Sequence, residues 1–233
     1  PFDYYRNLRV TNPSNYLYFY DFEDYQIIGA SPESLVSVKD GIVTTNPIAG
    51  TRPRGNDDEE DQRLAADLST DTKEVAEHRM LVDLGRNDIG RIAQIGTVEV
   101  TKYMEVEYFR YVMHLTSIVK GQLLKNVTVL DALKATLPAG TVSGAPKIRA
   151  MQRIYELEKE KRGIYAGAIG YLSATGDMDF AIAIRTMVVK NRKAYVQAGA
   201  GIVYDSVPEN EYQETLNKAK AMTKIGECYD SFN

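Results

Sequence analysis

The sequence has very little cysteine, no long apolar run and no excess of positive charge, and each absence narrows the class of protein. Its single cysteine, Cys228, cannot form a disulfide within the chain, so we expect a reducing, cytoplasmic location. No apolar run reaches the length of a membrane-spanning helix, and the first residues lack the apolar core of a signal peptide. A formal net charge of −4 argues against a nucleic-acid-binding surface. We therefore expect neither nucleic acid nor a membrane as a partner.

The chain also lacks an initiator methionine, low-complexity segments and any repeat of fixed period. The absent methionine indicates a fragment or a processed chain. Its 233 residues suffice for one large domain or two small ones, and 44% hydrophobic with 26% charged residues is ordinary for a globular protein. Composition leaves the function open, so it has to be sought in local patterns.

Alternating apolar patterns and turn residues predict a series of short strands and helices. Asp40-Gly41 is a strong hairpin signal, and the acidic residues 56–62 are typical of a connecting loop. The expected strands are residues 16–20, 26–29, 34–39, 42–47, 98–106, 165–172, 179–189 and 193–203. The expected helices are residues 71–85, 127–136 and 147–161, with a last helix that begins at Glu209.

Residues 197–221 combine a strand almost without side chains with an acidic helix. The bare strand, residues 197–201, lets a small molecule lie against backbone N–H groups. In the helix, Glu211, Glu214 and Lys218 share one face. The two carboxylates could hold a hard divalent cation, or they could be a solvated edge in which Lys218 pairs with Glu214.

A second helix repeats the spacing of carboxylates. Asp71 and Glu74 fit a capping box at its start, and Gly85 is the expected C-cap. Glu74 and Glu77 lie one turn apart. Two such helices facing one pocket could supply four carboxylates to one metal ion, although surface helices also contain many glutamates.

Small and basic residues in the segment 47–55, PIAGTRPRG, could bind an anion. Gly50 and Thr51 offer a backbone N–H and a hydroxyl, and Arg52 and Arg54 add positive charge. The alternative is that these arginines lie in plain solvent.

Several single residues have two interpretations each. Glu33 is a general acid if its site is dry, and otherwise a solvated turn residue. His114 is a buried acid or base, or a structural histidine. Thr141, in a loop of small residues, could donate to an anion or serve tight packing. Arg185 could bind a carboxylate of a ligand or of the protein.

Placed together, these segments resemble the chorismate-binding enzymes, in family order and over nearly the whole chain. The matching segments are PIAGTRPRG (47–55), EHRMLVDLGRNDIGR (77–91), VMHLTSIVKG (112–121), PAGTVSGAPKIRAM (138–151), RGIYAGAIGY (162–171), DFAIAIRT (179–186) and QAGAGIVYDSVPENEYQETLNKAKA (197–221). The resemblance implies an α+β fold, with mostly antiparallel sheets packed with helices around a central active site. It also implies that residues 1–227 are the C-terminal catalytic domain of a longer enzyme, followed by a tail at 228–233.

The resemblance assigns roles to particular residues. It implies that Glu77 and Glu214 bind Mg²⁺, with Glu74 and Glu211 nearby. It implies Glu33, His114 and Thr141 as the catalytic group. It implies that chorismate contacts Gly50, Thr51, Tyr165, Arg185, Gly199, Ala200, Gly201 and Lys218.

Within the family, the chain resembles the branch that converts chorismate and ammonia to anthranilate and pyruvate. Ala49 stands where enzymes that form aminodeoxychorismate usually have a nucleophilic lysine, and the loop 138–146 looks like that of the amine-adding enzymes. The resemblance further implies a glutamine amidotransferase partner that supplies ammonia, and a tryptophan feedback site that includes Asn15, Tyr16 and Leu17. Aminodeoxychorismate formation and a non-catalytic fragment that binds chorismate or a partner remain the alternatives.

Overall fold

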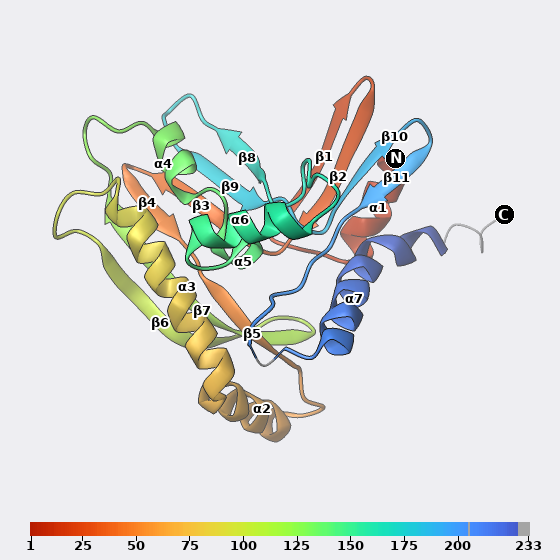
Figure 1. The fold of residues 1–233 in the computed structure, drawn as a ribbon, viewed down its shortest axis with the longest axis horizontal. Helices are drawn as coiled ribbons and strands as arrows, with labels where there is room; N and C mark the ends of the chain where they lie inside the picture. Colours follow the sequence, from red (N-terminus) through yellow and green to blue (C-terminus); the bar gives the residue numbers. More distant parts are fainter. Residues whose placement is uncertain (205, 228–233) are drawn as a thin grey trace. The chain divides into compact units, whose positions relative to one another are not determined.

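The computed structural model describes residues 1–204 and 206–227, which form helices and antiparallel strand pairs (Figure 1). The helices are α1 (Phe2–Thr11), α2 (Asp58–Thr70), α3 (Thr72–Gly90), α4 (Val129–Thr136), α5 (Gly140–Ser143), α6 (Lys147–Leu157) and α7 (Pro208–Glu227). The strands are β1 (Tyr16–Phe22), β2 (Tyr25–Ser31), β3 (Ser34–Lys39), β4 (Ile42–Thr45), β5 (Ile48–Pro53), β6 (Glu99–Tyr108), β7 (Val112–Gln122), β8 (Ala168–Leu172), β9 (Met178–Ile182), β10 (Thr186–Lys190) and β11 (Lys193–Val196). The predicted α+β class is confirmed. Within the part of the chain that the structure describes, no helix is both long and apolar enough to cross a membrane.

The chain divides into two compact units. The first comprises Pro1–Glu33, Thr141–Ile169 and Ala181–Asn233, and the second comprises Ser34–Gly140 and Gly170–Phe180. The expected catalytic domain at 1–227 stays a prediction. The expected tail at 228–233, with Cys228, lies outside the described residues.

The first unit is built on a four-stranded sheet in the order β1-β2-β10-β11, whose strand pairs are all antiparallel. Helices α1 and α7 contact each other, and α1 also packs on β1 and β2. Burial of apolar side chains from these elements forms the core, which is the main stabilising contribution. The core residues are Leu8, Ile28, Ala30, Met187 and Met222. Helix α1 was not predicted. Leu8 is its one buried residue, so the helix shows no repeating apolar pattern in the sequence.

The second unit is built on the larger sheet, in the order β5-β7-β4-β3-β9-β8, with β6 paired to β7. The predicted hairpin at Asp40-Gly41 is confirmed, since β3 and β4 pair on either side of it. Helices α2 and α3 pack on β5 and β7. Their contact buries Ala65 and Leu68 of α2 against Met113 and Leu115 of β7.

Two predictions in the second unit are wrong. Residues 56–62 are not a loop throughout, because α2 begins at Asp58, where the Asp57 side chain caps it by accepting from the Glu60 N–H. Gly85 does not end α3, which continues to Gly90. A Cβ on Gly85 would lie 3.0 Å from a methyl of Thr45, so this glycine allows the helix to approach the sheet closely.

Two predictions in the C-terminal meander are also wrong. The expected strand 179–189 is two strands, β9 and β10, separated by a bend at residues 183–185. The expected strand 193–203 ends at Val196, so Gly199, Ala200 and Gly201 lie in an irregular segment. Glycine loses more conformational freedom than other residues when it is fixed in a strand. A glycine-rich segment therefore favours irregular structure over a hydrogen-bonded strand.

Candidate functional site

Glu33 follows strand β2 and lies beside Thr141 of helix α5 in the first unit. The Thr141 hydroxyl donates a hydrogen bond to Glu33 Oε2 across 3.1 Å. The Glu33 carbonyl accepts from the Ile182 N–H at 3.0 Å, which fixes the backbone. Burial raises the pKa of the Glu33 carboxyl, and the Thr141 hydrogen bond and the charges of Arg185 and Lys218 oppose that rise. This partly buried carboxyl has the setting that a general acid needs.

Arg185 lies at the break between β9 and β10, where its φ is +49°. Its carbonyl accepts a hydrogen bond from the Ala30 N–H across 3.1 Å, beside the Thr186–Gly29 pair of β10 and β2. Burial lowers the pKa of the Arg185 guanidinium, while Glu33, Tyr165 and Glu214 raise it, with Glu33 having the largest effect of the three. Glu33 is therefore the main charged neighbour of this arginine.

Tyr165, Gly199 and Lys218 form a contact group in the same unit. A Cβ on Gly199 would lie 2.8 Å from the Tyr165 hydroxyl, so the glycine leaves room for the phenol. Lys218 Nζ donates to the Gly199 carbonyl at 3.2 Å and pairs with Glu214 Oε1 at 2.5 Å. The predicted pairing of Lys218 with Glu214 is thus present. Phenol and ammonium donors suit recognition of a carboxylate.

His114 of β7 lies opposite a bulge in β5 in the second unit. The register shifts between Ala49 and Arg52, and the residues between them are Gly50, with φ +67°, and Thr51. His114 Nδ1 is 2.8 Å from the Gly50 carbonyl oxygen and 3.1 Å from Thr51 Oγ1. Because a carbonyl only accepts, Nδ1 has the hydrogen and Nε2 keeps the lone pair in the neutral ring. Burial lowers the pKa of His114 and so favours this neutral form.

Helix α3 begins as predicted, with Asp71 as its N-cap. The Asp71 side chain accepts hydrogen bonds from the N–H groups of Lys73 and Glu74. Burial raises the pKa of the Glu74 carboxyl, and the negative charges of Glu77 and Asp71 raise it further. A divalent cation would relieve such crowding of carboxylates, so Glu74 and Glu77 fit a place in a Mg²⁺ site.

The four expected metal residues belong to two units: Glu74 and Glu77 to the second, Glu211 and Glu214 to the first. Glu211 is half-buried on α7, and Glu214 is exposed. Among the residues that the structure describes, no three His, Cys, Asp or Glu side chains are grouped as they would be in a preformed metal site. The metal role of these glutamates stays a prediction.

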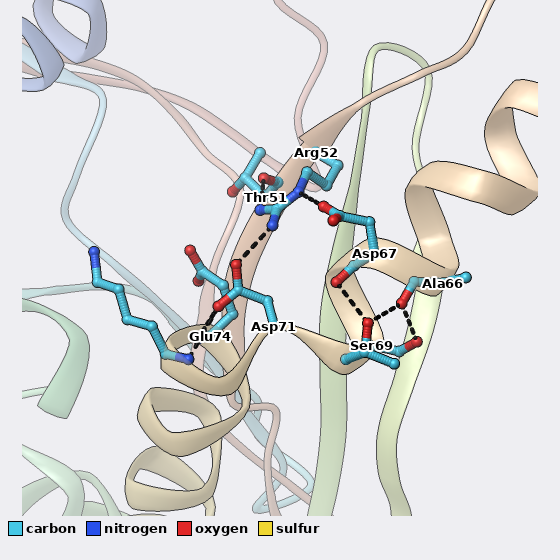
Figure 2. A network of polar contacts seen from close by, with 9 residues as sticks. Thr51, Arg52, Ala66, Asp67, Ser69, Asp71 and Glu74 are labelled. Carbon is cyan, nitrogen blue, oxygen red and sulfur yellow. Dashed lines mark hydrogen bonds and ion pairs between the residues drawn. The ribbon is translucent and has the colours of Figure 1, made fainter.

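Arg52 and Arg54 bind carboxylates of the protein, which corrects both interpretations of them as anion-binding or solvated residues. Arg52 Nε donates to Asp67 at 2.6 Å and an Nη donates to Asp71 at 2.8 Å (Figure 2). Arg54 Nε donates to both carboxylate oxygens of Asp61, at 3.1 and 2.9 Å. The sequence placed Asp61 in a polar stretch, gave Asp71 the role of a helix cap and gave Asp67 none, so it did not reveal the pairing.

The expected tryptophan residues lie at the start of β1. Asn15 is exposed just before the strand, and Tyr16 pairs with Ser31 of β2. Leu17 packs against the core of the first unit. Their regulatory role stays a prediction.

The sequence patterns gave no role to Arg162, which contacts two parts of the first unit. Its Nη1 donates to the Val142 carbonyl at 2.6 Å, next to Thr141. Its guanidinium carbon lies 5.6 Å from the centre of the Tyr165 ring, a cation–π contact. Its place three residues before Tyr165 in the segment RGIY is the only signal in the sequence that could have pointed to it.

Comparison with known proteins matches this chain to one family. The model of the chorismate binding enzyme family matches residues 1–224. The anthranilate synthase component 1 of Lactococcus lactis is 66% identical over 227 residues, which are 97% of this chain and 50% of that protein. That of Aquifex aeolicus is 59% identical over 96% of this chain and 45% of its own length. The chain thus spans about half the length of these curated relatives.

Solved structures agree with this match. The crystal structure of anthranilate synthase component I from Streptococcus pneumoniae has a TM-score of 0.89 and 79% identity, over 96% of this chain and 49% of that one. The menaquinone-specific isochorismate synthase of Escherichia coli has a TM-score of 0.78 and 30% identity, over 87% of this chain and 46% of that one. The chain belongs to the chorismate binding enzyme family.

Proposed function

We propose that this chain is the catalytic part of an anthranilate synthase large component, which converts chorismate and ammonia to anthranilate and pyruvate. The observation that supports this most is the hydrogen bond from Thr141 to the partly buried carboxyl of Glu33, beside the cation of Arg185. A carboxyl whose pKa is raised can donate a proton, and a neighbouring cation can bind a substrate carboxylate. The names of the relatives support the same reaction.

In the proposed reaction, the nitrogen of ammonia bonds to the ring and the C4 hydroxyl leaves as water. Glu33 supplies the proton that the leaving hydroxyl needs, and Thr141 holds one carboxyl oxygen so that the other can act. The aminated intermediate then loses pyruvate, and the ring becomes aromatic. Atoms balance, because one ammonia enters while one water and one pyruvate leave.

In the same proposal, neutral His114 assists departure of the C4 hydroxyl as a polar group. Because its Nδ1–H donates to the Gly50 carbonyl, its Nε2 lone pair can accept a hydrogen bond from a hydroxyl or from water. The Gly50–Thr51 bulge holds the ring in this orientation and offers its own polar groups to the substrate.

The carboxylates of chorismate are bound by donors of the first unit. Arg185 provides a planar guanidinium, Tyr165 a phenol and Lys218 an ammonium. The irregular backbone at Gly199, Ala200 and Gly201 adds N–H groups, and its own side chains are no larger than a methyl group.

Mg²⁺ is the proposed cofactor, with Glu77 and Glu214 as ligands and Glu74 and Glu211 nearby. The support lies in the donor chemistry, since hard divalent cations prefer carboxylate oxygen, and in the raised pKa of Glu74 among like charges. When bound, Mg²⁺ would orient a substrate carboxylate and offset negative charge.

The remaining features of the proposed enzyme follow from its relatives. The name component 1 implies a partner component, for which we propose a glutamine amidotransferase that delivers ammonia. Tryptophan is the proposed effector, since anthranilate is a precursor of it, and the cytoplasm is the proposed location, in line with a single cysteine.

The test is an assay of the natural full-length protein with chorismate, ammonium and Mg²⁺, followed by anthranilate fluorescence. The expected result is a signal that EDTA abolishes and that excess Mg²⁺ restores. Aminodeoxychorismate as the product would favour that rival branch, although Ala49 offers no nucleophilic amine. Chorismate that binds and is recovered unchanged would favour a non-catalytic binding protein.

A further inference from the structure

Arg52 joins three backbone segments of the second unit. Its guanidinium donates to Asp67 in the last turn of α2, to Asp71 at the start of α3, and to the Thr51 carbonyl of its own strand, at 2.6, 2.8 and 3.1 Å. The Arg52 side chain is only 20% exposed, so these contacts are partly shielded from water. Figure 2 shows the side chain between the two carboxylates. Because the guanidinium is planar, binding two carboxylates fixes their directions from Arg52 as well as their distances.

Asp71 has two functions at once. One carboxylate oxygen, Oδ1, accepts from the N–H groups of Lys73 and Glu74, and the other, Oδ2, accepts from Arg52. The first turn of α3 is therefore attached to strand β5 through a single carboxylate. An N-cap side chain by itself determines at which residue a helix begins. The additional hydrogen bond from Arg52 to Asp71 also fixes the position of that first turn against β5.

The attached turn holds Glu74 directly against the β5 bulge. A Cβ on Gly50 would lie 3.2 Å from Glu74 Oε2 and 2.9 Å from a methyl of Leu68. The Gly50 carbonyl in turn accepts from His114. Glu74, Gly50 and His114 thus form one connected group next to Arg52.

We propose that Arg52 is a positioning residue, which through Asp71 sets the first turns of α3 against the Gly50–Thr51 bulge. The residues so positioned are Glu74 and Glu77, whose role in holding a divalent cation rests on the function proposed above. Arg52 touches neither the substrate nor the cation. It keeps the carboxylates in place before a ligand arrives, as residues behind metal ligands do elsewhere.

Arg54 provides a matched control two residues away. It binds Asp61 in α2, donates to the Phe109 carbonyl at 2.8 Å and lies over the Tyr108 ring at 5.3 Å. Like Arg52, it is an arginine with a carboxylate partner, and it lies just after the end of β5 at Pro53. Its contacts go to α2, to the last residue of β6 and to the turn that follows, and none of the contacts described for it goes to α3.

The experiment compares Arg52→Lys with Arg54→Lys in the natural full-length protein. Lysine keeps the charge but cannot bind two carboxylates in a fixed fork. Binding of Mn²⁺, measured by electron paramagnetic resonance without substrate, should weaken about tenfold or more in Arg52→Lys and less than about threefold in Arg54→Lys. The melting temperature of each variant shows whether loss of stability alone explains the change.

Asp71→Asn supplies a second variant, because asparagine still caps a helix but lacks the charge that Arg52 binds. If the two residues act as one unit, the double variant should bind Mn²⁺ no more weakly than the worse single variant. Equal Mn²⁺ affinity in Arg52→Lys and Arg54→Lys would overturn the proposal, and so would a wild-type protein that binds no Mn²⁺. A wild type that binds Mn²⁺ in the expected pattern but forms no anthranilate would contradict the proposed function alone.

Discussion

The hydroxyl of Thr141 donates to the carboxylate of Glu33 although the two residues are 108 positions apart in the chain. This contact joins the end of β2 to the short helix α5 inside one compact unit. The hydrogen bond orients Glu33, the proposed acid. It also lowers the pKa of Glu33, although burial raises that pKa by more. The proposed proton transfer therefore depends on a balance that single substitutions can shift.

Replacing Thr141 by valine should move the pH dependence of the reaction. Without the hydrogen bond the pKa of Glu33 rises, so the pH at which kcat falls through loss of the acid form should move upward. Because one carboxyl oxygen is no longer held, kcat should also fall about tenfold. The pH profile of kcat measures both effects. Thr141→Ser keeps the hydroxyl and should keep the profile, whereas an unshifted profile in the valine variant would contradict the role of Thr141.

Adding a methyl group at Gly199 should weaken substrate binding. The new Cβ would lie 2.8 Å from the Tyr165 hydroxyl, so the phenol would have to move. The KM for chorismate should rise about tenfold or more, with a smaller change in kcat. In the double variant Gly199→Ala with Tyr165→Phe, removal of the hydroxyl relieves the clash, so the added alanine should cost little beyond the effect of Tyr165→Phe alone. Fully additive losses would show that the two residues do not act through this contact.

Glu214→Gln should weaken the dependence on Mg²⁺ without unfolding the protein. Changes behind a metal ligand already cost tenfold to hundredfold in affinity, so loss of a ligand should raise the Mg²⁺ concentration for half-maximal activity at least about tenfold. Glu209→Gln, in the first turn of the same helix, is the control. A titration of activity with Mg²⁺ measures both variants. If the two titrations coincide with that of the wild type, Glu214 is not a ligand.

Buried His78 should make stability depend on pH. Its Nε2 lies 2.6 Å from Ser117 Oγ, and burial lowers its pKa from 6.5 to about 4. Since the unfolded state takes up the proton first, the stabilising contribution is present above pH 6.5 and is lost as pH falls from 6.5 to about 4. The loss between pH 7 and pH 5 should be about 2 kcal/mol.

Urea unfolding of the wild type and of His78→Gln at these two pH values measures that loss. The glutamine variant should be less stable at neutral pH and should depend less on pH. An equal dependence in both proteins would assign the effect to other groups.

Local signals predicted the elements whose cause is local. Asp40-Gly41 gave the β3–β4 hairpin, and Asp71 gave the start of α3, because turn and cap preferences act over a few residues. Local signals did not predict the structure of the segment 179–189 correctly. Its alternating pattern is that of one strand, yet contacts with Ala30, Glu33 and Ala166, which are distant in sequence, bend the backbone at Arg185.

The site was predicted in parts. Motifs singled out Glu33, Thr141, Arg185 and His114, but no motif could show that Thr141 reaches Glu33 or that His114 faces the Gly50 carbonyl. Those contacts arise from tertiary packing. The same holds for Arg52, whose expected anion is in fact the pair Asp67 and Asp71, supplied by the chain itself.

The most direct test of the proposed function follows the fate of the nitrogen. The natural full-length protein is incubated with chorismate, Mg²⁺ and ¹⁵N-labelled ammonium, and the products are identified by mass spectrometry. The predicted result is ¹⁵N-labelled anthranilate together with an equal amount of unlabelled pyruvate. Production of both should be strongly reduced in Glu33→Gln. Labelled aminodeoxychorismate, unlabelled isochorismate or unchanged chorismate would contradict the account.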